Sequence, residues 1–130
     1  MMRAFRLPIL VGAVLVGGLL IAGPAKAGKL VDAAPDLMRG YAEQAGYLLA
    51  SIPKCGGDAE EEQYFRDLAR DNLLQIGADE DDLGFLDFHM DQAAAAAKPK
   101  NRDCSEDGGV PLASELFRLR AEIQQALEVQ

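Results

Sequence analysis

The chain has 130 residues and a formal net charge of −8, from 13 lysines and arginines against 21 aspartates and glutamates. This length suits one small domain, and the acidity argues against nucleic acid as a partner because phosphates repel a negative surface. One histidine and no tryptophan leave few side chains for catalysis, so we predict a protein that is not an enzyme and holds no cofactor. The negative charge predicts a basic protein partner.

Residues 1–27 have the layout of a secretory signal peptide. Arg3 and Arg6 precede an uncharged apolar stretch over residues 7–22. This stretch is shorter than the roughly 20 residues that a membrane-spanning helix needs, and small residues follow it. We therefore predict export to the periplasm or secretion, with an uncleaved anchor as the alternative.

The segment ends in a cleavage pattern. Ala25 and Ala27 place small side chains at positions −3 and −1 of a signal peptidase site. Cleavage after Ala27 would leave residues 28–130 as a single helical domain without a stable membrane anchor. It would remove three cations and lower the formal net charge from −8 to −11.

Cys55 and Cys104 are the two cysteines of the chain. In an oxidising compartment we expect them to pair with each other. The bridge would close a loop of about 50 residues, which the chain-entropy model values at roughly 4 kcal/mol. A redox-active or metal-binding pair is the alternative, but the Cys-x-x-Cys spacing of such sites is absent from the sequence.

The first predicted helix covers residues 31–52. Asp32 suits its N-cap, Pro35 its first turn, and Pro53 its end. Its apolar residues recur at intervals of three and four, which is the period of a helix face: Val31, Ala34, Met38, Tyr41, Ala45, Leu48 and Ile52.

The second predicted helix begins at Asp58, with Glu61 in the position of a capping box, and ends at Gly77. Its predicted buried residues are Tyr64, Phe65, Leu68, Ala69, Leu73 and Ile76. The third begins at the acidic run of residues 79–82 and ends before Pro99. Its buried stripe is Leu83, Leu86, Met90, Ala93 and Ala97.

A polar loop over residues 98–110 follows and contains Cys104. Pro111 then opens the last helix. The predicted stripe of this helix is Leu112, Leu116, Leu119, Ile123, Ala126 and Leu127. Four helices with short turns predict an all-α fold, a small antiparallel helical bundle with one disulfide.

Several large apolar side chains lie off these stripes: Tyr47, Leu49, Leu74, Phe85, Phe88 and Phe117. They either widen the core faces or share an exposed patch. Phe85 and Phe88, one turn apart and beside His89, form the candidate partner patch, with burial of both rings in the core as the alternative.

Two metal sites are weighed and not adopted. Asp79, Asp81 and Asp87 match positions 1, 3 and 9 of a calcium-binding EF-hand loop. Positions 5 and 12 are Leu83 and Met90, which supply no carboxylate. The helix dipole, which favours acids in the first turn of a helix, explains three acids there equally well. A copper site at His89 and its neighbour Met90 is also disfavoured, because adjacent residues of a helix point about 100° apart.

A small exported helical domain whose two cysteines, Cys55 and Cys104, lie about 50 residues apart is similar in layout to the periplasmic acid-stress chaperones of the HdeA kind. The leading functional hypothesis is a non-enzymatic protein that acts by protein contact, as an adaptor, an inhibitor or a subunit of an envelope assembly. The alternatives are an acid-stress chaperone-like protein, which that resemblance implies, and a calcium-binding or copper-binding protein.

Overall fold

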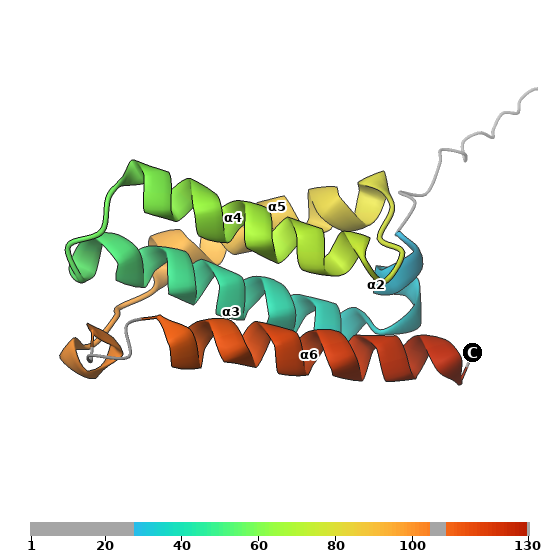
Figure 1. Ribbon diagram of the computed structural model, residues 1–130. Coiled ribbons are helices and arrows are strands. Elements are labelled where there is room, and N and C mark those ends of the chain that lie inside the picture. The colour runs from blue at the N-terminus through green and yellow to red at the C-terminus, as the bar shows by residue number, and fades with distance from the viewer. Residues whose placement is uncertain (1–27, 105–108, 130) are drawn as a thin grey trace, which may run out of the picture.

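The computed structural model describes residues 28–104 and 109–129 (Figure 1). These residues form an all-α bundle without strands in the described ranges, which confirms the predicted fold class. The predicted signal peptide lies outside them. The elements are α2 (Lys29–Ala33), α3 (Pro35–Lys54), α4 (Ala59–Leu74), α5 (Glu80–Ala96), the short 3-10 helix η3 (Asn101–Cys104) and α6 (Val110–Glu128).

The first predicted helix is two helices, α2 and α3. Ala34 leaves the helical conformation, with φ −149° and ψ 66°, because the ring of Pro35 disfavours α backbone at the preceding residue. Pro35 then opens α3. The prediction of Asp32 as N-cap is wrong, since Asp32 lies within α2 and no side chain caps α3. The break turns α2 back so that Leu30 is fully buried.

The predicted starts of the next two helices are confirmed. Asp58 accepts a hydrogen bond from the backbone N–H of Glu61 and caps α4. Asp79 and Asp82 cap α5 reciprocally, each side chain accepting from the other residue's backbone N–H. Gly77 adopts φ +98° in the turn between α4 and α5, a conformation that favours glycine.

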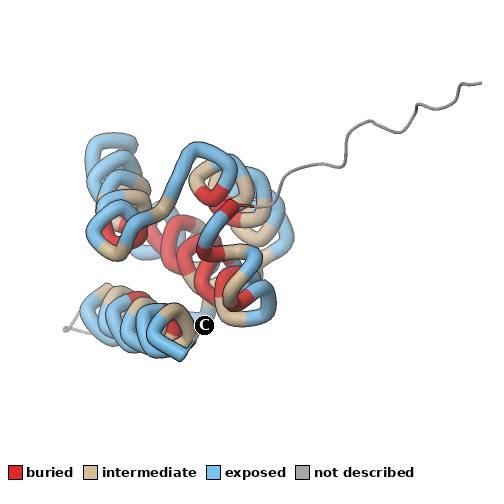
Figure 2. The backbone as a smooth tube through the Cα atoms, turned by 90° about the vertical axis from the view of Figure 1, so that its right-hand side faces the viewer, coloured by how far each residue is buried: buried red, intermediate tan, exposed pale blue. Residues whose placement is uncertain are grey.

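α3 is the central helix, and Figure 2 shows the buried residues gathered toward the middle of the bundle. Its closest neighbour is α5. A Cβ on Gly46 would come 2.5 Å from the carbonyl oxygen of Met90 and 2.6 Å from the Cβ of Ala93. The small residues of the two helices therefore bring their backbones into direct contact.

The predicted disulfide is confirmed. Cys55, just after α3, and Cys104, at the end of η3, are bonded with 5.3 Å between their Cα atoms. The bridge ties the polar loop to the end of the central helix. Within residues 28–104 and 109–129, no helix combines the length and apolar character needed to span a membrane.

Candidate functional site

Exposed apolar side chains gather where α4 and α6 meet. Tyr64 on α4 is 62% exposed, and Val110 and Phe117 on α6 are 63% and 44% exposed. The prediction that Tyr64 belongs to the buried stripe of α4 is therefore wrong. Ala69 and Leu73 of that stripe are buried, and Tyr64 lies on the flank of the helix instead.

One row of α6 side chains faces α4. Arg120 donates a hydrogen bond to Oε1 of Gln75 at 2.7 Å, and its guanidinium lies over the ring of Phe117, 5.7 Å from the ring centre. Val110, Ala113, Phe117 and Arg120 follow one another at intervals of three and four residues, so they share one side of the helix. The exposed α6 residues are thus on the side that contacts α4.

The matching row of α4 contains Tyr64, Leu68 and Gln75, which are also spaced as one helix face. α4 and α6 run in the same direction, since Phe65 and Gly109 line one pocket near the starts of the two helices and Gln75 meets Arg120 farther along. The two rows therefore run side by side. We call the surface formed by Tyr64, Leu68, Val110, Ala113 and Phe117 the α4–α6 face.

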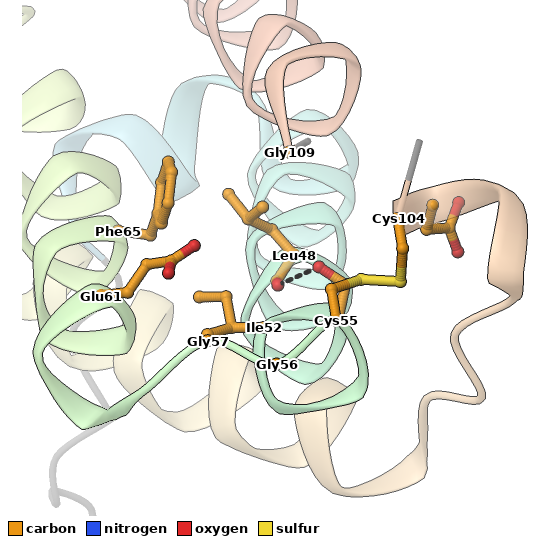
Figure 3. A pocket seen from close by; sticks show the side chains of 11 residues that line it. Leu48, Ile52, Cys55, Gly56, Gly57, Glu61, Phe65, Cys104 and Gly109 are labelled. Carbon is orange, nitrogen blue, oxygen red and sulfur yellow. Dashed lines mark hydrogen bonds between the residues drawn. A yellow bond between two sulfur atoms is a disulfide. The ribbon is translucent and has the colours of Figure 1, made fainter. Parts of the chain in front are cut away.

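A pocket of about 240 Å³ lies at the disulfide end of this face. Figure 3 shows Phe65 and Glu61 of α4 on one side, Leu48 and Ile52 of α3 in the middle, and the disulfide on the other side. Pockets for drug-sized ligands usually measure about 300–1,000 Å³. This pocket is therefore smaller than a typical site for a drug-sized ligand and has room for one or two side chains of a partner.

Negative charge borders the face along α4. Glu60, Asp67 and Asp71 are exposed and recur at intervals of seven and four residues, next to Tyr64 around the helix. The arginines of α4 lie on its other side. Arg66 and Arg70 reach α5, where each makes an ion pair of 2.8 Å, with Asp91 and Asp87 respectively. The outer edge of α4 therefore presents carboxylates.

The patch predicted on α5 is half formed. Phe88 is 58% exposed, whereas Phe85 is half-buried and packs against the core. The ring of His89 contacts both, tilted against Phe85 with ring centres 4.3 Å apart and edge-on to Phe88 with ring centres 5.0 Å apart. Burial lowers the pKa of His89 from its ordinary value, assisted by the charge of Arg39. The three rings are thus one cluster, of which Phe88 is the exposed part.

Two of the three candidate calcium ligands have partners within the fold. Asp79 caps α5, and hydrogen bonds from the backbone N–H groups of Asp82 and Lys29 hold its pKa below the ordinary value. Asp87 pairs with Arg70 of α4, and Asp81 is exposed. In the described part of the chain, no three histidine, cysteine, aspartate or glutamate side chains are grouped as a metal site would require. Met90, weighed for copper, is fully buried.

Sequence patterns identify only part of the α4–α6 face. Phe117 is off the predicted stripe of its helix and could be recognised as surplus. Tyr64 is wrongly predicted to be buried, because it lies four residues before Leu68, and this spacing is also that of a buried stripe. Val110 lies in the predicted loop, and only the observed start of α6 places it on the same side as Phe117.

The comparisons with known proteins give no relative for this arrangement. No protein-family model, curated protein or solved structure matches the chain.

Proposed function

We propose that the protein is an exported, non-enzymatic binding protein whose α4–α6 face takes a basic amphipathic segment of a partner polypeptide. The observation that carries this proposal is the apolar row Tyr64, Val110 and Phe117, exposed beside a line of carboxylates. An amphipathic helix binds by laying its apolar side chains into such a surface. The role is that of an adaptor, an inhibitor or a subunit of an envelope assembly.

Charge complementarity selects the partner. Glu60, Asp67 and Asp71 border the face on the α4 side, and Glu61 projects toward the pocket at its end. Lysine or arginine side chains flanking the apolar side of the partner would lie against these carboxylates. Such pairs at an exposed rim speed association and set specificity more than they add affinity, and salt weakens them.

Export is supported by two independent features. The first is the segment 1–27, whose layout is that of a secretory signal peptide. The second is the Cys55–Cys104 bond, because structural disulfides persist mainly in oxidising compartments. An exported protein of this kind would meet its partner in the periplasm or outside the cell.

Binding of a designed peptide tests the proposed function. The probe is a helical peptide with leucines on one side and lysines on the other, and its counterpart carries glutamates in place of the lysines. We expect the lysine peptide to bind and the glutamate peptide not to bind. Replacing Tyr64 and Phe117 together by serine should weaken binding at least tenfold, and raising the salt concentration should weaken it further.

The Phe88→Ser variant is the matched control, because Phe88 is as exposed as Tyr64 but lies on α5. We expect it to bind within twofold of the wild type. Equal loss of binding in the Phe88→Ser variant would move the site to the α5 patch and overturn the proposal. Failure of the wild type to prefer the lysine peptide would also overturn it.

A further inference from the structure

Gly28 packs directly on a buried carboxylate. Gly28 itself is buried, and a Cβ added to it would come 2.0 Å from Oδ1 of Asp82 and 2.5 Å from the Asp82 backbone nitrogen. Its backbone conformation, φ −75° and ψ 170°, is open to any residue. The requirement for glycine is therefore one of space against Asp82.

The same contact limits the distance between the Gly28 nitrogen and this carboxylate. A backbone nitrogen lies about 2.5 Å from the Cβ position of its own residue. Added to the 2.0 Å from that position to Oδ1 of Asp82, this places the nitrogen within about 4.5 Å of the oxygen. A terminal amine at this position would therefore lie at or near the separation of about 4 Å that defines an ion pair.

Asp82 is fully buried and is held by backbone donors. The N–H groups of Leu30, Val31 and Asp79 each donate to its carboxylate at 3.0 Å. The N–H of Lys29 donates to the neighbouring carboxylate of Asp79, also at 3.0 Å. These bonds fix α2 to the start of α5, across about 50 residues of sequence.

Hydrogen bonds satisfy the oxygens of Asp82 but supply only partial positive charge. A buried carboxylate without a cation is costly, because it has lost its hydration. Within the described residues no ion pair reaches Asp82 or Asp79. The side chain of Lys29 lies beside Gly77 instead, since a Cβ on Gly77 would come 3.0 Å from the Lys29 ammonium nitrogen.

The cleavage pattern of the sequence ends at the same bond. Ala25 and Ala27 occupy the −3 and −1 positions of a signal peptidase site, and Gly28 is the next residue. Hydrolysis adds water across the Ala27–Gly28 bond, leaving a carboxylate on Ala27 and an amine on Gly28. At neutral pH an α-amine is largely protonated.

We propose that cleavage after Ala27 makes the α-ammonium of Gly28 the counter-ion of buried Asp82, so that processing of the chain completes the link between α2 and α5. The processed chain is then more stable than any chain in which Gly28 is joined to a preceding residue. Gly28 is suited to this position because no other residue lets the chain end approach Asp82 as closely.

Capping the terminus of the processed chain tests this proposal. Residues 28–130 contain every residue of the core cluster, which extends from Leu30 to Ile123. Acetylation of the Gly28 amine removes its charge, and we expect it to raise the unfolding equilibrium constant about tenfold in the wild type. In the Asp82→Asn variant acetylation should change that constant less than twofold. A purely steric effect of the acetyl group would persist in that variant.

Asp81→Asn is the control, because it removes the same charge from the exposed neighbour of Asp82. This variant should respond to acetylation as the wild type does. An equal response in all three proteins, or no response in the wild type, would overturn the proposal.

A second measurement needs no substitution at Asp82. An amine-directed reagent should label the α-amine of the chain that starts at Gly28 at least tenfold more slowly than the α-amine of a chain that keeps Ala27. Equal labelling rates would show that the Gly28 amine is not paired, and the proposal would fail even if the Asp82→Asn variant did not fold.

Discussion

The two sides of the central helix α3 are packed in different ways. Toward α5, Gly46 meets Ala93 and the backbone of Met90 so closely that a single methyl group has no room. On the side formed by α4 and α6, polar side chains join the helices, as where Arg120 reaches Gln75, and large apolar side chains remain exposed. Small residues allow two helix backbones to come into direct contact. Long side chains keep two helices farther apart and leave apolar side chains exposed that a partner could contact.

The largest effect that we expect comes from removing the disulfide, which lies at one end of the side formed by α4 and α6. Replacing Cys55 and Cys104 together by serine should lower the free energy of unfolding by about 4 kcal/mol, because the unfolded chain gains the entropy of an open loop. Urea denaturation measures the change. Wild-type protein kept in reductant serves as the control and should lose a similar amount. A loss below about 1 kcal/mol would mean that packing alone holds this loop in place.

The next largest effect is expected from a substitution at the close contact between α3 and α5. Gly46→Ala should cost about 2–3 kcal/mol, because the new methyl group forces α5 away from α3. Gly40→Ala in the same helix is the matched control, since nothing lies within 4 Å of its Cβ position. Glycine costs a helix up to about 1 kcal/mol relative to alanine, so this control should be stabilised. The contrast fails if the two variants change thermal stability in the same direction.

Tyr41 connects α3 to α4 on the side formed by α4 and α6. Its buried hydroxyl donates a hydrogen bond to the carbonyl of Ala69 at 2.8 Å, and Tyr41→Phe should cost about 1 kcal/mol. Burial raises the pKa of Tyr41 from 10.0 to about 12.

This pKa shift also predicts a pH dependence. Above pH 10 the unfolded chain loses the Tyr41 proton while the folded chain retains it up to about pH 12, so the free energy of unfolding falls as the pH rises through this window. Denaturation at several alkaline pH values should show a shallower fall in Tyr41→Phe. Equal slopes in Tyr41→Phe and the wild type would contradict this prediction.

The smallest effect concerns the contact of α3 with η3. The Tyr47 hydroxyl donates to Asp103 at 2.6 Å and, with the N–H of Lys100, lowers the pKa of Asp103 from 3.8. The stabilisation from this carboxylate is present above pH 3.8 and is lost as the pH falls through the folded-state pKa. In an NMR titration, Tyr47→Phe should raise the pKa of Asp103. The pKa of Asp79, which other donors lower, should not move.

Local chemistry made most of the helices predictable. Asp58 and Asp79 cap the helices that their positions predict, and Pro53 stands one residue before the last residue of α3. The pairing of Cys55 with Cys104 followed from there being two cysteines in a chain expected to be exported. These features depend on neighbouring residues or on the number of cysteines, so they can be predicted without knowledge of the tertiary structure.

Features set by the meeting of distant helices were harder to predict. The stripe rule placed Tyr64 in the core, but which side of α4 is covered depends on where α6 packs. The sequence pattern identifies Asp82 only as one of the acids that start α5. Its hydrogen bond from the backbone N–H of Leu30 depends on the turn at Ala34. The apolar residues keep helical spacing across Ala34, so the spacing alone does not predict the turn. The effect of Pro35 on the preceding residue is the signal that does.

The fold-back of α2 has a consequence for the order of folding. Leu30 is buried by contacts of its helix with α3, α5 and α6, so its site is incomplete until most of the chain has been synthesised. Closing such long loops is slow compared with forming local helices. The segment that is made first after residue 27 is therefore among the last to acquire its native neighbours, and it stays exposed on the growing chain until α6 has been made.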